Sequence, residues 1–179
     1  MVFAIRYLVL IGLVCMSSLV FASEIDREKP ITIEADRVDV DDIKGLSVYR
    51  GNVVFRQGTI ELLSDELAIK TTEQRELISV KATGQPARFK QKNIERQTEL
   101  KGHALEITYE VDSEYMLFIG DAYFWQCGDE VTGNKVEYFG EKGLVKARRA
   151  ENGNGRVQVT LQPREEGEGK KGCLQQGNP

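Results

Sequence analysis

Hydrophobic and polar residues alternate along most of the chain after its first two dozen positions. The runs 31–35, 105–111 and 157–161 show the pattern most clearly. A period of two places every second side chain on the same face of an extended strand. The pattern therefore predicts an all-β protein whose strands each turn one apolar face inward.

The segment "ELLSDELAIKTTEQREL" (61–77) departs from this pattern, because it is rich in residues that favour helices. Its leucines also stand at helical spacing. Local propensity alone predicts a helix here. A repeat within the chain favours a strand instead.

The repeat has a spacing of 69 positions, since "GNVVFRQGT" begins at Gly51 and "GDAYFWQCG" begins at Gly120 (120 minus 51). In the second copy, the partner of the segment 61–77 is "DEVTGNKVEYF". Its glycine and β-branched residues are typical of strands and turns. We therefore predict strands in both copies.

Four glycines open similar units at a nearly fixed period: Gly51, Gly84, Gly120 and Gly153, spaced by 33, 36 and 33 residues. Such a period indicates a stack of similar units that bury their apolar faces only together. We expect each unit to be a broad V of strands with glycine at the corner. The predicted fold is an elongated, twisted, open β-jelly roll of short, mostly antiparallel strands, with an apolar interior trough and unpaired edges at its two ends.

Segments rich in Gly, Asn and Asp separate the alternating runs and predict hairpin turns. They are "DDIKG" (41–45), "TGQPA" (83–87), "FGEKG" (139–143) and "ENGNGR" (151–156).

The N-terminus carries an apolar run from Tyr7 to Phe21 behind Arg6, and it ends in the small residues expected before a signal-peptidase site. We predict a signal peptide over 1–22, cleaved after Ala22, a β-jelly-roll domain over 23–162 and a disordered, Gly-rich charged tail over 163–179. An uncleaved membrane anchor is the alternative. Lipidation of Cys15 is disfavoured, because the valine before it does not fit a lipidation signal.

The net charge of −4 disfavours nucleic acid as a partner. Cys127 and Cys173 lie beyond the predicted cleavage site, in a chain expected to be exported. An exported protein encounters conditions in which a disulfide between them would persist. Because Cys173 lies in the predicted disordered tail, the interpretation favoured here is two free thiols.

Candidate catalytic residues are sparse. His103 is the single histidine and has no evident catalytic partner. The aspartates of "DRVDVDDIKG" (36–45) lack the spacing of a calcium loop. Tyr123 and Trp125 alternate along one strand, as in ordinary packing. We expect no enzyme activity, no cofactor and no metal site.

Five segments together resemble the LptA/OstA family of periplasmic lipopolysaccharide-export components. They are "PITIEADRVDVDD", "YRGNVVFRQGTIELLSDEL", "GQPARF", "KGHALEITYE" and "GDAYFWQ". The resemblance runs from about Lys29 to Leu161. Departures include Ser64 in place of an alanine, Asn134 in place of an aspartate, and the cysteines.

The resemblance implies a bridge protein that carries lipopolysaccharide from the inner to the outer membrane. The implied lipid-binding residues are Ile31, Ile33, Phe89, Tyr109 and Val111. The implied interaction edges are Ile31, Thr32, Ile33, Glu34 and Ala35 at the N-terminal end, and Val157, Gln158, Val159, Thr160 and Leu161 at the C-terminal end. The implied partners are an LptC-like inner-membrane component at the first edge, an LptD-like outer-membrane component at the second, and further copies joined head to tail.

Two alternatives stay open. One is an LptC-like anchored component of the same pathway, which would keep its N-terminal segment. The other is a carbohydrate-binding or adhesin-like β stack, which would bind through exposed aromatic side chains and not through a buried trough.

Overall fold

A computed structural model describes residues 26–93, 97–151 and 155–163. These residues form one ten-stranded antiparallel sheet. Two short 3-10 helices, η1 (Asp26–Glu28) and η2 (Gly140–Lys142), accompany it. The strands are β1 (Ile31–Glu34), β2 (Arg37–Asp41), β3 (Leu46–Gln57), β4 (Ile60–Thr71), β5 (Leu77–Asn93), β6 (Thr98–Glu110), β7 (Tyr115–Gln126), β8 (Asp129–Phe139), β9 (Leu144–Arg148) and β10 (Gln158–Thr160).

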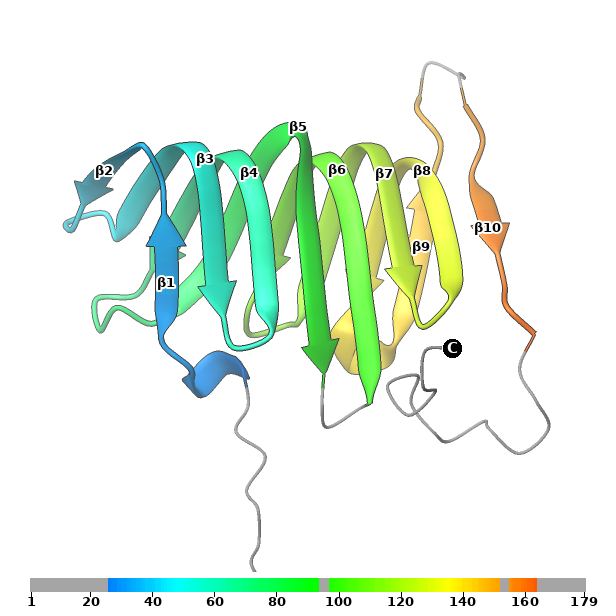
Figure 1. Ribbon diagram of the computed structural model, residues 1–179, viewed down its shortest axis with the longest axis horizontal. Helices are drawn as coiled ribbons and strands as arrows, with labels where there is room; N and C mark the ends of the chain where they lie inside the picture. The colour runs from blue at the N-terminus through cyan, green and yellow to red at the C-terminus, as the bar shows by residue number, and fades with distance from the viewer. Residues whose placement is uncertain (1–25, 94–96, 152–154, 164–179) are drawn as a thin grey trace, which may run out of the picture.

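The strands stack in chain order along the long axis of the molecule (Figure 1). Strands β1 and β2 both pair with β3, each with a different half of it. Strands β10 and β9 likewise share β8 at the other end. The result is the elongated, open all-β architecture that the sequence predicts.

Each long strand bends once, so the sheet folds into two arms. The front arm, nearer the viewer in Figure 1, contains β1, β10 and residues 53–57, 60–64, 87–93, 98–103, 122–126 and 129–133. The rear arm contains β2, β9 and residues 46–50, 66–71, 77–83, 106–110, 115–119 and 135–139. The pairing register shifts at every bend.

The bends of β3 and β7 confirm the predicted role of glycine at the corners. Gly51 and Gly120 have φ values of 81° and 79°, and the following residues, Asn52 and Asp121, both have a φ of 47°. A side chain at either glycine would be strained, because L-residues rarely adopt positive φ. Side-chain amides and carboxylates tolerate this region better than most, which fits Asn52 and Asp121.

The 69-residue repeat is a structural repeat. Strand β3 begins at Leu46 and ends at Gln57, and β7 begins and ends 69 positions later, at Tyr115 and Gln126. Strand β4 confirms that the segment with helical propensity is extended. Its burial alternates between the two faces along the front arm, so burial of one face in the sheet overrides local preference.

The predicted turn at 83–87 is wrong, because this segment lies inside β5. It forms the bend of that strand, which confirms the corner predicted at Gly84, and the Gln85–Pro86 peptide bond is cis. Gly and Pro suit a bend within a strand as well as a hairpin turn. The turns predicted at 41–45 and 139–143 do connect β2 to β3 and β8 to β9, whereas residues 152–154 of "ENGNGR" lie outside the described part.

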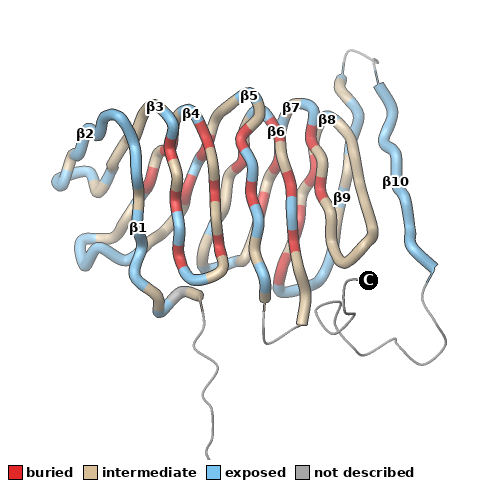
Figure 2. The backbone as a smooth tube through the Cα atoms, in the orientation of Figure 1, coloured by how far each residue is buried: buried red, intermediate tan, exposed pale blue. Residues whose placement is uncertain are grey.

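The core lies between the two arms (Figure 2). Its most deeply buried large side chains include Phe118, Phe124, Leu67 and Ile107.

At the N-terminal end, Asp26 holds η1 against the sheet. Its carboxylate accepts hydrogen bonds from the Thr59 backbone N–H at 2.8 Å and from the Gln91 side-chain amide at 3.2 Å.

Cys127 lies in the turn between β7 and β8 and is disulfide-bonded, so the prediction of a free thiol there is wrong. That prediction rested on the cost of ordering a flexible tail, but the entropy cost of closing a loop grows only slowly with its length. Cys173 lies outside the described residues, as do the predicted signal peptide (1–22) and all but Pro163 of the predicted tail. In the described part of the chain, no helix is long and apolar enough to cross a membrane.

Candidate functional site

The inner surface of the front arm carries a continuous row of side chains that runs through every layer of the stack. Successive strand pairings place its members side by side: Ile33, Phe55, Leu62, Phe89, Gly102, Phe124, Val131 and Val159. No member is charged. The row therefore gives the front arm an apolar inner lining from β1 to β10.

The rear arm faces this row with two rows of its own. One consists of Tyr49, Leu67, Ala82, Ile107, Phe118, Val136 and Ala147, and the other of Ser47, Ile69, Val80, Tyr109, Met116, Tyr138 and Val145. We call the space between the front row and these two rear rows the trough.

The structure brings two of the predicted lipid-binding residues together. Phe89, on the front arm, and Tyr109, on the rear arm, line the same small cavity of about 10 Å³. A cavity of this size has room for one water molecule at most. In this structure, the middle of the trough is thus filled by the side chains that line it.

The other predicted lipid-binding residues lie nearer the ends of strands. Ile33 pairs with Phe55 and packs against the core, while Ile31 pairs with Gln57 and is 40% exposed. Val111 lies in the turn after β6, and not on a strand as its alternation predicted. Its backbone N–H donates to the Ile78 carbonyl at 3.1 Å, which ties that turn to β5.

The two arms approach each other closely at Gly102. A Cβ atom added to this residue would lie 2.5 Å from Cε1 of Phe118, on the rear arm. Phe118 is fully buried, and its ring packs edge-on against that of Phe124 at a centroid distance of 5.7 Å. The absence of a side chain at Gly102 therefore lets the Phe118 ring cross the trough and hold the arms together.

The trough has an apolar opening at its C-terminal end. A cavity of about 340 Å³ lies there, lined by Phe124, Gln126, Asp129, Val131, Val145, Ala147, Val157, Val159 and Leu161. Val145 and Ala147 belong to β9 (Leu144–Arg148), a strand that the sequence did not predict. The C-terminal end of the stack therefore consists of the predicted edge on the front arm and of β9 on the rear arm.

The N-terminal end is also apolar and exposed. Val38 and Val40 of β2 are 49% and 58% exposed, and Ile31 of β1 is 40% exposed. Only Gln158, Val159 and Thr160 of the predicted C-terminal edge form β10, and Ala35 lies just beyond β1. Arg56 ties β1 to its neighbours, because it forms ion pairs with Glu34 of β1 at 2.9 Å and with Glu61 of β4 at 3.3 Å.

The aspartates of the segment 36–45, which were candidate calcium ligands in the sequence, lie outside the trough. Arg50 pairs with Asp39, Lys44 pairs with Asp41, and the Asn52 amide donates to Asp36. Within the described ranges, no group of three or more His, Cys, Asp or Glu side chains could hold a metal ion. His103 projects from the outer face of the front arm, where burial and the charge of Arg88 lower its pKa, so the imidazole is neutral at pH 7.

Comparison with known proteins identifies the family. Residues 32–144 match the family described as LptA/(LptD N-terminal domain) LPS transport protein. The chain belongs to this family. Among LptA-type relatives, it is 31% identical to the lipopolysaccharide export system protein LptH of Pseudomonas aeruginosa, over 83% of this chain and 87% of that protein. It is 28% identical to LptA of Escherichia coli K12, over 71% of this chain and 69% of that one.

A solved LptA-type structure has the same fold. The crystal structure of LptH from Pseudomonas aeruginosa, described as the LptA-homologous periplasmic component of the lipopolysaccharide transport device, superposes with a TM-score of 0.68. The two chains are 31% identical, and the match covers 77% of this chain and 99% of that one. The open β-jelly roll is thus shared with a solved member of the family.

Proposed function

We propose that this protein binds lipopolysaccharide in the periplasm and carries it from the inner to the outer membrane as a bridge protein. The observation that carries the proposal is the uncharged front row, which is continuous from Ile33 to Val159 and faces two rear rows. A continuous lining suits a ligand that moves along the protein better than one bound at a single point.

The acyl chains of the lipid explain why such a lining is needed. Each methylene group hidden from water contributes about 0.8 kcal/mol, so exposing one chain of a dozen carbons costs roughly 10 kcal/mol. An uncharged trough keeps these chains out of water while the sugars stay solvated. No chemical step is required, so we propose a transport role without catalysis.

The proposed lipid contacts are Ile31, Ile33, Phe89, Tyr109 and Val111. Because the trough between Phe89 and Tyr109 holds a cavity of only about 10 Å³, the acyl chains must separate the arms as they enter. Separating the arms costs the least free energy at their free ends, which are the hairpin turns, because those turns lie farthest from the bends that join the arms.

The two ends of the stack are the proposed interaction sites. In the described part of the chain, β1 and β2 pair only with β3, and β9 and β10 pair only with β8, so each end leaves unpaired backbone groups. Such edges accept a further strand. We propose that the edge Ile31–Ala35 takes an LptC-like component, that the edge Val157–Leu161 takes an LptD-like component, and that copies join head to tail between them.

The domain organisation expected from the sequence fits this role. We propose export through a signal peptide over 1–22, a periplasmic jelly-roll domain over 23–162 and a tail over 163–179. Export would place the trough in the compartment between the two membranes.

The test is a mass measurement of protein released gently from the periplasm, together with any lipid that copurifies. We expect a lipid A-containing species and a mature N-terminus at Ser23. Two neighbouring substitutions provide a matched pair: Ile33→Glu places a charge on the inner side of β1, and Thr32→Glu places the same charge on the outer side. Only Ile33→Glu should lose the lipid. Equal retention by both variants, or an absence of lipid from the unmodified protein, would contradict the proposal.

A further inference from the structure

A second concavity lies on the outer face of the front arm, on the opposite side of the sheet from the trough. It has a volume of about 260 Å³. One wall consists of Glu61, Lys90 and Lys101, which are neighbours in successive strands. The other wall consists of Leu63, Arg88, His103 and Tyr123, which are neighbours in the same way. Phe89 and Gly102 of the front row lie between the two walls and complete the lining. We call this concavity the outer cleft.

The outer cleft has an excess of positive charge. Of its side chains, Arg88, Lys90 and Lys101 are cationic, and Glu61 alone is anionic. Lys90 pairs with Glu61 at 2.9 Å, and Lys101 pairs with Glu99, outside the cleft, at 3.3 Å. Arg88 forms no ion pair or hydrogen bond within the described part of the chain and is exposed. Its guanidinium is thus available to a ligand, with five donors in a plane suited to a carboxylate or phosphate.

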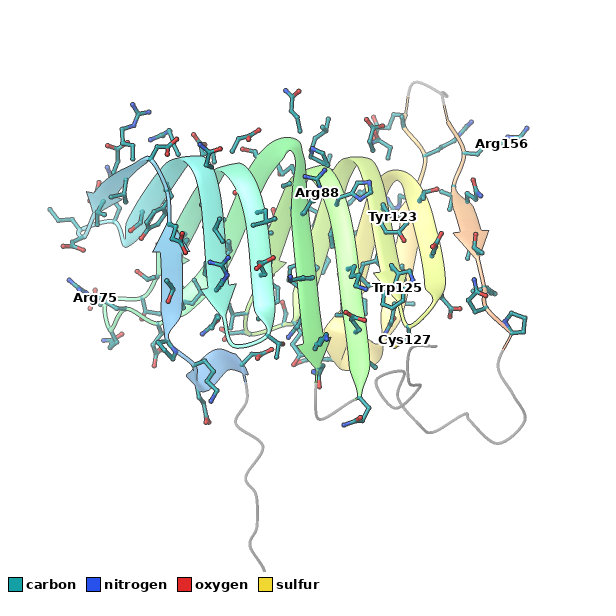
Figure 3. All side chains as sticks on the ribbon, viewed as in Figure 1. Arg75, Arg88, Tyr123, Trp125, Cys127 and Arg156 are labelled. Atoms are coloured by element: carbon teal, nitrogen blue, oxygen red, sulfur yellow. The ribbon has the colours of Figure 1, made fainter. Side chains whose placement is uncertain are left out.

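Aromatic rings line the same surface. The His103 and Tyr123 rings stack at a centroid distance of 4.9 Å, with 14° between their planes. The Lys101 ammonium lies 4.5 Å from the centre of the Trp125 ring, one row away. Figure 3 shows Arg88, Tyr123 and Trp125 together on the front of the stack. These rings are only partly buried and face away from the core, so core packing does not explain them.

Rings and cations side by side favour a particular ligand class. The faces of aromatic rings carry partial negative charge and attract the polarised C–H groups of a sugar ring. A bare inorganic anion would use the cations but not the rings or Leu63, and a neutral sugar would leave the guanidinium of Arg88 without its preferred partner. A sugar that carries a carboxylate or a phosphate uses both.

We propose that the outer cleft binds an acidic sugar unit, with its anionic group on Arg88 and the face of its ring against Tyr123. The cleft is slightly smaller than the pockets that enclose drug-sized ligands, so it fits one or two sugar rings. Arg88 and Lys90 face outward, while Phe89 between them faces inward, so the sugar site and the trough lie on opposite sides of the sheet. Sugar binding in the outer cleft therefore does not depend on lipid binding in the trough.

His103 provides the measurement, since it is the only histidine in the chain and lines the cleft. The imidazole signals in NMR spectra of the exported protein are followed while four probes are added separately. Two are acidic sugars, the deacylated oligosaccharide of lipopolysaccharide and N-acetylglucosaminyl-N-acetylmuramic acid. The other two are glucose and inorganic phosphate.

We expect saturable shifts of the His103 signals with at least one acidic sugar, and none with glucose or phosphate at the same concentration. Burial and then the charge of Arg88 hold the pKa of His103 below its ordinary value, against the opposing charge of Asp121, and this pKa should rise when an anion occupies the cleft. The acidic sugar that binds more tightly identifies the source of the ligand. Absence of a saturable shift with either acidic sugar, or equal shifts with phosphate, would overturn the proposal.

Substitutions separate the two interactions. Arg88→Gln should weaken acidic-sugar binding at least tenfold, and Tyr123→Leu several-fold, while Arg88→Lys should restore only part of the loss because lysine cannot bind bidentately. Arg156→Gln removes the same charge from an exposed arginine at the C-terminal end (Figure 3) and should have no effect. All four variants should keep the lipid bound in the trough. Equal weakening by Arg88→Gln and Arg156→Gln would show that net charge alone attracts the sugar and would overturn the assignment.

Discussion

Gly102 lets the two arms close, and Gly102→Ala tests this contact directly. The new Cβ would lie 2.5 Å from Cε1 and 2.9 Å from Cζ of Phe118, and 2.9 Å from the backbone carbonyl oxygen of Tyr123. Real Cβ atoms do not approach other heavy atoms so closely, so the ring or the strand must move. Phe118 is fully buried, and extra methyl groups in a packed core typically cost about 1–3 kcal/mol.

For a domain of this size, 1 kcal/mol corresponds to about 4 °C in Tm, so Gly102→Ala should lower the Tm by about 4–12 °C. Urea denaturation should give a lower midpoint with an unchanged m value.

A double-mutant cycle with Phe118→Leu identifies the contact responsible. Leucine is shorter than phenylalanine, so the double variant should be more stable than the sum of the two single changes predicts, by about 0.5–2 kcal/mol. The relief should be partial, because the Tyr123 carbonyl stays in place. Additive losses, or a Gly102→Ala protein within about 0.5 kcal/mol of the unmodified one, would refute the view that Phe118 holds the arms together through this glycine.

Three further predictions follow from individual residues. The hydroxyl of Ser64 is buried and, in the described part of the chain, has no hydrogen-bond partner, so Ser64→Ala should raise the free energy of unfolding in urea by about 1 kcal/mol; a loss of stability would contradict this. Burial and a hydrogen bond to Glu137 raise the pKa of Tyr115 to about 12. The free energy of unfolding should therefore fall between about pH 10 and pH 12 as the phenol ionises, and it should fall less in Tyr115→Phe. Identical pH profiles for the two proteins would contradict this assignment. The backbone N–H groups of Gln158 and Val159 point to opposite sides of β10, so one of them faces β8 and the other faces the open edge. Proline removes this N–H group, so either Gln158→Pro or Val159→Pro should abolish head-to-tail association in light scattering while β10 stays paired with β8. The proposed end contact is wrong if neither variant does so.

The sequence predicts the strands well because each strand has two different faces. Alternation separates those faces wherever one side is buried. The 69-residue repeat, and not alternation, predicted β4 correctly against local helix propensity. The bends at Gly51 and Gly120 were also predictable, because positive φ restricts the residue type. At 83–87 the predicted corner at Gly84 is confirmed but the predicted hairpin turn is wrong, since local turn chemistry does not reveal whether the chain reverses direction.

Contacts between distant strands were beyond sequence analysis. The Phe118 ring reaches Gly102 from the other arm, and no local pattern connects these positions. The outer cleft depends on cross-strand register, which places Arg88 beside His103 and His103 beside Tyr123. Alternation did show that Tyr123 and Trp125 share a face. It did not show that this face is the outer one, where Tyr123 stacks on His103 and Lys101 lies over the Trp125 ring.

The most direct test of the account is photo-crosslinking in cells that export lipopolysaccharide. A photoreactive amino acid is placed at Ile33 and at Tyr109, which face the trough from the front and rear arms. It is also placed at their outward neighbours, Glu34 and Thr108. None of the four side chains lines the outer cleft, so binding there does not affect the comparison. Transport through the trough predicts capture of lipopolysaccharide from Ile33 and Tyr109 and little or none from Glu34 and Thr108. Equal capture from inward and outward positions would contradict it.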